Sequence, residues 1–283
     1  MKRVYTLYVA KDPAINGNFC GYNSSEDLFN MLLLSSISSA KHFDKCELYC
    51  SKRGYEMLKK DGRPFPFTDI IVCFDDLETW LMPHNWAYPK IITYSMQEEP
   101  FVHIDCDAII CDGLPPALLQ MKFIFQQKEL LSSPRHPFYR IAYNDSKNLG
   151  ILPEIITELP AYGMCMGLFG CIEKDWLFIV KAYCETIRLY LLKQQKVAGE
   201  LTCSFAQPHL FEQLFISSFL QAHSLKENKD FGTFLTDNLK NKFYPSYRFS
   251  HFLAEHKRSK HISYSIKKEL IQLGLYNYSR QKI

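Results

Sequence analysis

The sequence predicts an α/β fold: a single domain with a mixed, mostly parallel sheet that is flanked by helices. Two observations lead to this prediction. Apolar strand-like segments alternate with helical segments over the first 104 residues, as in parallel sheets that are covered on both faces. The 283 residues also contain no internal repeat, no low-complexity tract and no linker rich in Pro, Gly or Ser, which favours one compact domain.

The individual elements follow from local composition. Runs of β-branched and aromatic residues mark the strands, beginning with RVYTLYVA. Ser24 begins a helix, because the acidic residues that follow it resemble a capping box. The expected strands are 3–10, 47–50, 69–74, 100–104 and 122–126. The expected helices are 24–42, 51–60, 85–96, 135–148, 172–195, 208–222 and 259–273, and 161–170 is expected to form a glycine-bearing turn.

The composition excludes several classes of protein. With 47% hydrophobic and 22% charged residues, the chain is globular rather than disordered. No apolar run reaches the roughly 18–20 residues of a membrane span, and the N-terminus reads as a strand rather than a signal peptide, so we predict a cytoplasmic protein. The ten cysteines include no Cys-x-x-Cys pair and are expected to be buried, reduced thiols.

Positive charge is concentrated at the C-terminal end. The formal net charge is +3, yet the residues from Lys240 onward hold ten Lys or Arg against two Glu. Such a basic segment suits phosphate groups, an anionic membrane surface or nucleic acid, and it can also be no more than a solvated face. No nucleic-acid-binding motif is present, so we expect no nucleic acid partner.

Two aspartates follow the apolar segment that ends at Ile104. The run FVHIDCD alternates with period two, which places Asp105 and Asp107 on one face, about 6–7 Å apart, and Cys106 on the other. Ligands of open α/β sheets bind at the carboxyl ends of the strands. Hard carboxylate oxygens in that position favour Mg²⁺ or Mn²⁺, with open positions for substrate phosphates, although two solvated aspartates that cap a turn have the same pattern.

Three blocks together resemble the GT-A glycosyltransferases, most closely the glycogenin and lipopolysaccharide galactosyltransferase-like group. The segment 101–110 is similar to the Asp-x-Asp strand of that family, and 161–170 is similar to its Phe-Asn-x-Gly turn on the acceptor side. The segment 251–257 matches a His-x-x-Gly-x-x-Lys pattern near the C-terminus. The order of elements agrees over 3–257. The resemblance implies a GT-A-like, Rossmann-like fold in a divergent member of the group.

The resemblance also implies roles for particular residues. His251 would be the third metal ligand beside Asp105 and Asp107, and Lys257 would contact the donor diphosphate. The cofactor would be Mn²⁺ or Mg²⁺, and the donor a nucleotide-diphosphate sugar, with a UDP-sugar as the first expectation. Two positions depart from the family: Ala254 replaces a glycine near the phosphates, and Cys165 replaces the asparagine that contacts sugar hydroxyls.

The resemblance further implies candidates for the chemistry. Glu212 and Gln213 are similar to an acidic residue and glutamine on a later helix of the family. An inverting enzyme would use a general base, with Glu212 first and Asp175 second, whereas in a retaining enzyme Gln213 would lie beneath the anomeric carbon. Asp105 would contact the donor as well as the metal. Further donor contacts, assigned from their positions alone, are Val9, Ala10, Lys11, Asp76 and Lys90.

The predicted organisation is one catalytic domain over 1–283. Residues 1–110 would bind the donor, 111–246 would form the acceptor side, and 247–283 would supply the metal and diphosphate segment with a final helix. The acceptor (a saccharide, a peptide or a lipid-linked group) stays open. An apolar stripe on the final helix is expected to pack on the domain, the alternative being contact with an anionic membrane.

Two other functions fit parts of this pattern. A sugar-nucleotide pyrophosphorylase would share the α/β core, but it would need a glycine-rich, arginine-containing loop after the first strand, and 11–17 lacks it. A GT-A-like protein that binds nucleotide without catalysis, or serves as a scaffold, remains the alternative to an enzyme. Hydrolysis of the donor in the presence of Mn²⁺ distinguishes the two.

Overall fold

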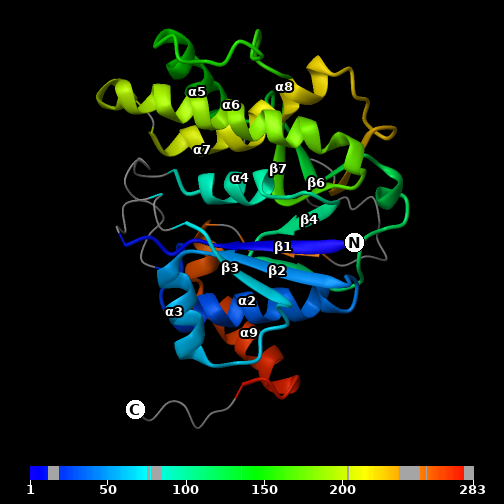
Figure 1. Cartoon of the computed structure of the whole chain (residues 1–283). Coiled ribbons are helices and arrows are strands. Elements are labelled where there is room, and N and C mark those ends of the chain that lie inside the picture. Colours follow the sequence, from blue (N-terminus) through cyan, green and yellow to red (C-terminus); the bar gives the residue numbers. More distant parts are fainter. Residues whose placement is uncertain are drawn as a thin grey trace.

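The computed structural model describes residues 1–11, 19–74, 77, 85–134, 136–202, 204–235, 249–252 and 254–276, without the side chains of 204, 254 and 255. Within this part of the chain, a seven-stranded sheet lies between two layers of helices (Figure 1). The strands of this sheet are β1 (Lys2–Leu7), β2 (Lys45–Cys50), β3 (Asp69–Val72), β4 (Phe101–Ile104), β6 (Phe123–Leu130), β7 (Tyr162–Cys171) and β8 (Phe231–Leu235).

The sheet is mixed and mostly parallel. Its strand order is β3-β2-β1-β4-β7-β6-β8. Strands β1, β2, β3 and β4 pair in parallel, as do β6 and β8, while β7 is antiparallel to both of its neighbours, β4 and β6. Since β4 and β6 both run opposite to β7, their carboxyl ends lie at the same edge of the sheet. The predicted fold class is therefore confirmed.

Helices cover both faces of the sheet. On one side lie α2 (Ser25–Ala40), α3 (Lys52–Asp61) and α9 (Lys260–Gln272); on the other lie α4 (Tyr88–Ser95), α5 (Pro137–Asn148), α6 (Leu177–Lys196), α7 (Gln207–His209) and α8 (Phe215–Ala222) (Figure 1). Side chains of β1 and of the residues just after it alternate between the two sides of the sheet. Val4 and Tyr8 lie in the core beneath α4 and α6, whereas Tyr5 and Leu7 lie in the core beneath α2. A strand that is buried on both faces needs apolar residues at nearly every position.

The helix starts follow the expected capping chemistry. Ser24 caps α2 by accepting a hydrogen bond from the backbone N–H of Asp27, and Ser51 caps α3 in the same way through Gly54. Each cap satisfies a backbone donor that the first helical turn leaves without a partner. One expected helix differs from the prediction: 208–222 contains a π-helical turn, Leu210–Leu214, between α7 and α8.

The segment 161–170 is a buried strand, not the predicted turn. Strand β7 occupies Tyr162–Cys171 and pairs on both sides. Its glycines make room for neighbouring side chains: a Cβ at Gly163 would lie 2.6 Å from Tyr139, and one at Gly170 would lie 2.7 Å from Ile124. The glycines therefore reflect close packing at the centre of the sheet rather than a reversal of the chain.

A second, two-stranded sheet joins distant parts of the sequence. Strand β5 (Ala108–Ile110) pairs antiparallel with β9 (Phe249–His251). After β9 comes a short 3₁₀ turn, Ala254–Arg258, and then α9. This sheet brings the C-terminal segment to the end of β4.

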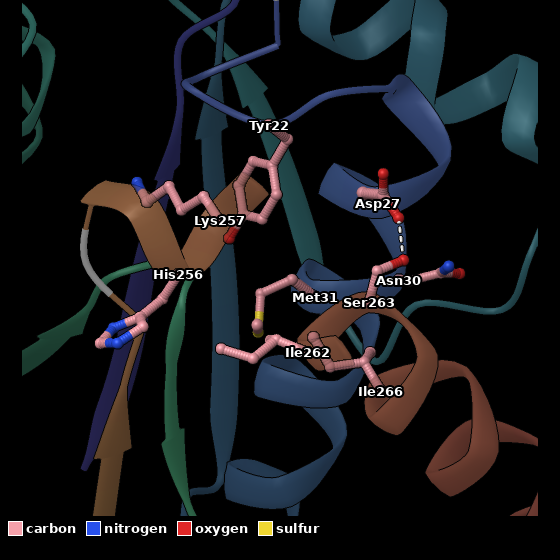
Figure 2. A pocket seen from close by; sticks show the side chains of 9 residues that line it. All are labelled: Tyr22, Asp27, Asn30, Met31, His256, Lys257, Ile262, Ser263 and Ile266. Carbon is pink, nitrogen blue, oxygen red and sulfur yellow. Dashed lines mark hydrogen bonds between the residues drawn. The ribbon is translucent and has the colours of Figure 1, made fainter. Parts of the chain in front are cut away.

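Helix α9 packs against α2. Ile266 and Leu270 are buried among the residues of that layer, as the predicted apolar stripe requires, whereas Leu273 is 48% exposed. Ser263 donates a hydrogen bond to Asp27, as Figure 2 shows. Among the described residues no helix is both long enough and apolar enough to cross a membrane. The nine described cysteines are free thiols, as predicted, but only five of them are buried, while Cys20, Cys73, Cys106 and Cys111 are partly exposed.

Candidate metal and diphosphate site

The two aspartates lie in a turn that joins β4 to β5. Strand β4 ends at Ile104, and the backbone N–H of Ala108 donates to the carbonyl of Asp105 over 3.0 Å. The period-two prediction for Asp105 and Asp107 was therefore wrong, because the strand geometry stops one residue before the first aspartate. The turn folds the two carboxylates toward a common point instead of spacing them along one face.

The β5–β9 pairing places His251 beside the aspartates. His251 is the register partner of Ala108, and the N–H of Phe252 donates to the carbonyl of Asp107 over 3.0 Å. His251 Nε2 lies 3.2 Å from Asp107 Oδ1 and 3.7 Å from Asp105 Oδ2. One ligand atom from each of the three residues lies within 4.8 Å of the other two. The three residues predicted as metal ligands are thus together at the carboxyl edge of the sheet.

The far side of the histidine ring is held by Gln126. His251 Nδ1 donates to Gln126 Oε1 over 2.7 Å, and this bond turns Nε2 toward the carboxylates, where it lies within hydrogen-bond distance of Asp107 Oδ1. A second hydrogen bond of this kind is typical of metal-binding histidines. This contact has room because residue 167 is a glycine: a Cβ there would lie 2.2 Å from Gln126 Oε1 and 2.4 Å from His251 Cε1. The donor set and its support therefore fit a divalent cation such as Mn²⁺.

A bulge in β7 supplies backbone groups to the same place. In the register, Phe125 pairs with Phe169 while Gln127 pairs with Cys165, so three residues of β7 stand opposite one residue of β6. The carbonyl of Gly167, in this bulge, accepts the N–H of Asp105 over 3.0 Å. Bulges next to a site re-aim backbone and side-chain groups. Here the bulge orients the aspartate turn.

Lys257 forms an ion pair with Asp107. Its Nζ lies 2.7 Å from Asp107 Oδ2, and 23% of its side chain is exposed. Burial alone would raise the pKa of the Asp107 carboxyl, but Lys257 and His251 outweigh burial and hold this pKa below its usual value. Burial opposes the charge of Lys257, yet Asp107 keeps the lysine pKa above its ordinary value. Asp107 is consequently ionised, and Lys257 is a cation beside it.

Lys90 connects Asp105 to Glu212. Its Nζ lies 2.8 Å from Asp105 Oδ1 and 2.5 Å from Glu212 Oε1, and it also donates to the carbonyl of Met166 over 3.3 Å. Glu212 is fully buried. Burial raises the pKa of Glu212 to about 6, although Lys90 acts in the opposite direction. The predicted donor contact Lys90 and the predicted catalytic residue Glu212 therefore belong to one charge network with the aspartates.

Two other candidates for catalysis lie elsewhere. The Gln213 side chain takes part in a separate buried cluster, where its Oε1 lies against the hydroxyl of Tyr139. Asp175 is exposed in the 3₁₀ turn Lys174–Trp176, which follows the end of β7. Because Cys171 at that end pairs with Phe101 at the start of β4, Asp175 lies at the opposite edge of the sheet from Asp105. The structure does not bring Asp175 together with the other candidates.

The residues after β1 lie at the same edge as the aspartates. Cys106 Sγ donates to the carbonyl of Thr6 over 3.2 Å, which ties the aspartate turn to the end of β1. Val9 and Ala10 are fully buried, and Lys11 is exposed. Among the other predicted donor contacts, Asp76 lies outside the described residues.

A small cavity lies behind Lys257, between α2 and the start of α9 (Figure 2). Its volume is about 10 Å³, which is room for about one water molecule, and too little for a nucleotide. The ring of Tyr22 packs beside the Lys257 side chain, with Nζ 5.5 Å from the ring centroid. This cavity therefore belongs to the packing of the C-terminal segment and is not a donor pocket. Its lining residues are Tyr22, Asp27, Asn30, Met31, His256, Lys257, Ile262, Ser263 and Ile266.

Two residues of the site were not predicted in their roles. The sequence predicts Gln126 only as part of a strand and Gly167 only as part of a turn. The available signal for Gln126 is that a pair of glutamines directly follows the apolar and aromatic run FIF in FIFQQKEL. A buried amide needs a partner, so such a residue marks a polar contact, although the sequence does not say with which side chain.

Comparison with known proteins gives one family. No curated protein matches the chain. Among solved structures, the crystal structure of mouse xyloside xylosyltransferase 1 in its apo form is similar over 82% of this chain and 85% of that one, with a TM-score of 0.41 and 10% identity. The chain matches the family described as "Family of unknown function (DUF6734)" over residues 1–280, and it belongs to that family.

Proposed function

We propose that the protein is a glycosyltransferase that requires a divalent cation, Mn²⁺ or Mg²⁺, and transfers a sugar from a nucleotide-diphosphate donor, first of all a UDP-sugar. The observation that carries this proposal is the group formed by Asp105, Asp107 and His251, whose ligand atoms lie within 4.8 Å of one another. Two carboxylates and a neutral imidazole match the preferences of these ions, and a site at the carboxyl edge of an α/β sheet is where ligands bind.

In this proposal the three residues hold the cation, which supplies positive charge to the diphosphate leaving group. Lys257 is the residue that meets the diphosphate directly. Its side chain is 23% exposed, so Nζ can reach a phosphate oxygen, and the cation would then compensate the buried carboxylate of Asp107. Lys90 stays in the interior, where it orients Asp105 and balances the charge of Glu212.

Glu212 can act in this proposal either as the residue that orients Lys90 or as the general base. Full burial against Lys90 favours a role in orienting Lys90, while a general base would have to reach an acceptor hydroxyl. A base is active when it is deprotonated, so kcat/KM would rise with pH through about 6, the pKa of Glu212, and Glu212→Gln would remove this rise. A pH profile that is the same in both proteins supports the orienting role. Gln213, in its separate cluster, remains a proposed acceptor-side residue.

The same proposal assigns a function to each part of the chain. Residues 1–110 bind the donor, with Val9, Ala10 and Lys11 near the base or ribose. Residues 111–246 face the acceptor, and 247–283 supply the histidine and lysine of the site. This arrangement is consistent with the β5–β9 pairing, which joins the first and last parts.

The decisive experiment measures binding of UDP by thermal shift, with Mn²⁺ or with EDTA. Ligands that bind only the folded state raise its melting temperature. We expect UDP to stabilise the protein in Mn²⁺ only, and Asp107→Ala to lose this effect. Asp175→Ala, on the other edge of the sheet, is the matched control and should behave as the unchanged protein. Equal stabilisation by UDP in EDTA would contradict the proposal.

A second function, nucleotide binding without catalysis, has one observation in its favour. Each aspartate already has a lysine partner, Asp105 in Lys90 and Asp107 in Lys257, so neither carboxylate depends on a cation for a partner. Hydrolysis of UDP-glucose, UDP-galactose and UDP-xylose with Mn²⁺ separates the two functions. Release of UDP that Asp107→Ala abolishes supports the enzyme, whereas binding without any turnover supports the second function.

A further inference from the structure

Three aromatic side chains from distant parts of the chain contact one another. Trp86 precedes α4, Phe138 lies at the start of α5, and His209 ends α7. The ring centroids of Trp86 and His209 are 6.0 Å apart, and those of His209 and Phe138 are 4.2 Å apart. Trp86 is 36% exposed, and the other two are partly exposed. We refer to Trp86, Phe138 and His209 as the aromatic platform.

The aromatic platform lies next to the candidate metal site. Trp86 is four residues before Lys90, and His209 is three residues before Glu212, so each is about one helical turn away. Lys90 and Glu212 are themselves in contact over 2.5 Å. The Trp86–His209 contact and the Lys90–Glu212 contact therefore join the same two segments, one turn apart.

Polar groups lie directly below the aromatic platform. Tyr139, which follows Phe138, donates to Glu129 Oε2 over 2.6 Å, and Gln127 donates to Glu129 Oε1 over 3.0 Å. His136 Nδ1 is 3.7 Å from Glu129 Oε2. Gln127 Oε1 is buried and has no hydrogen-bond partner among the described residues. Gln127 and Glu129 belong to the carboxyl end of β6, at the same edge of the sheet as the carboxyl end of β4, after which Asp105 follows.

We propose that the aromatic platform binds a sugar ring of the acceptor, so that the acceptor is a saccharide. This proposal rests on the proposed function. A sugar ring has an apolar face of C–H groups and a rim of hydroxyls. Aromatic rings cover the first, while the partly exposed imidazole of His136, whose ring centroid is 5.7 Å from that of Phe138, binds the second. A saccharide bound to the aromatic platform would approach the donor site from the side of Glu212.

Binding is tested on the full chain with Mn²⁺ and UDP present, by saturation-transfer NMR with maltotriose, lactose, xylobiose and chitobiose as probes. We expect at least one probe to bind, and Trp86→Ala to weaken its binding by about tenfold, which corresponds to about 1.4 kcal/mol. Phe178→Ala is the matched control. Phe178 is 55% exposed and also stacks with neighbouring rings, but it begins α6 on the opposite edge of the sheet.

The melting temperature of Trp86→Ala shows whether the variant folds, and its Mn²⁺-dependent binding of UDP should be unchanged. Should this variant fail to fold, Trp86→Phe and Phe138→Ala replace it: the first should keep saccharide binding and the second should lose it. Saccharide binding that Trp86→Ala and Phe138→Ala leave intact overturns the proposal. So does a protein that binds UDP with Mn²⁺ but none of the saccharides. Absence of UDP binding instead counts against the proposed function.

Discussion

Gln126 Oε1 accepts a hydrogen bond from His251 Nδ1 over 2.7 Å, across 125 positions of sequence. This contact decides which ring nitrogen faces the carboxylates. With Nδ1 engaged, Nε2 is the nitrogen that faces Asp107, 3.2 Å away. In a neutral imidazole only one nitrogen carries the proton, so the glutamine selects the tautomer that can ligate a cation.

Gln126→Ala should weaken Mn²⁺ binding by about 10–100-fold, the usual effect of removing a second-layer partner from a metal-binding histidine. Isothermal titration calorimetry measures the change. Gln221→Ala, which alters an exposed glutamine on α8, serves as the control and should leave the affinity unchanged. Unaltered Mn²⁺ binding in Gln126→Ala would mean that His251 is oriented by something else.

Gly167→Ala should disturb the same contact from the opposite side. The added Cβ would lie 2.2 Å from Gln126 Oε1, so one of the two side chains must move. We expect a loss of about 1–3 kcal/mol in folding stability, the range for overpacked sites, together with weaker Mn²⁺ binding. Gly199→Ala is the matched control, because a Cβ at Gly199 has no atom within 4 Å. Chemical denaturation compares the two variants, and equal stabilities would refute the argument.

Lys257→Ala should weaken UDP binding by about 1.5–3 kcal/mol, the range for a hydrogen bond that involves a charged group. Uridine, which has no phosphate, should bind as before. Lys260→Ala, which removes an exposed lysine at the start of α9, is the control. Calorimetric titration with both ligands measures the difference. Equal losses for UDP and uridine in Lys257→Ala would place the lysine away from the diphosphate.

His209 should make folding stability depend on pH in the acid range. Burial lowers the pKa of His209 to about 4, although a hydrogen bond with the backbone of Ala206 acts in the opposite direction. The unfolded chain, with a histidine pKa of about 6.5, binds the proton first. The contribution is therefore complete above pH 6.5 and is lost as pH falls toward 4, by up to about 3 kcal/mol.

The prediction for His209 is checked by urea unfolding of the unchanged protein and of His209→Phe between pH 4 and 7. The difference between their free energies of unfolding should change with pH in the stated direction. His261→Phe, at an exposed position of α9, should give a difference that stays constant. A constant difference for His209→Phe as well would show that His209 takes up its proton equally in the folded state.

Leu270→Ala should show how much α9 contributes to folding stability. Leu270 is fully buried against the α2 layer, so its truncation should cost about 2–5 kcal/mol. Leu273→Ala, three residues later and 48% exposed, should cost little. Thermal unfolding compares the two. Similar melting temperatures would mean that α9 is peripheral, and binding to anionic vesicles at low salt would then become the next measurement.

The sequence by itself determined the layers of the protein. The alternation of strands and helices predicted a mostly parallel sheet with two covered faces, and the serines at 24 and 51 marked helix starts that the structure confirms. These features depend on residues a few positions apart, so local patterns contain them. The resemblance carried by three short blocks also named Asp105, Asp107 and His251, which lie together.

Only the tertiary structure decided how the site is built. The pairing of β5 with β9 and the contact between His251 and Asp107 join residues 144 positions apart, and no local pattern specifies such a partner. Strand β7 shows the same limit. Its glycines predict a turn when they are read locally, but in the folded sheet they make room for Tyr139, Ile124 and the His251–Gln126 pair. The role of a glycine or a buried glutamine depends on which side chain packs against it, and the tertiary packing decides which side chain that is.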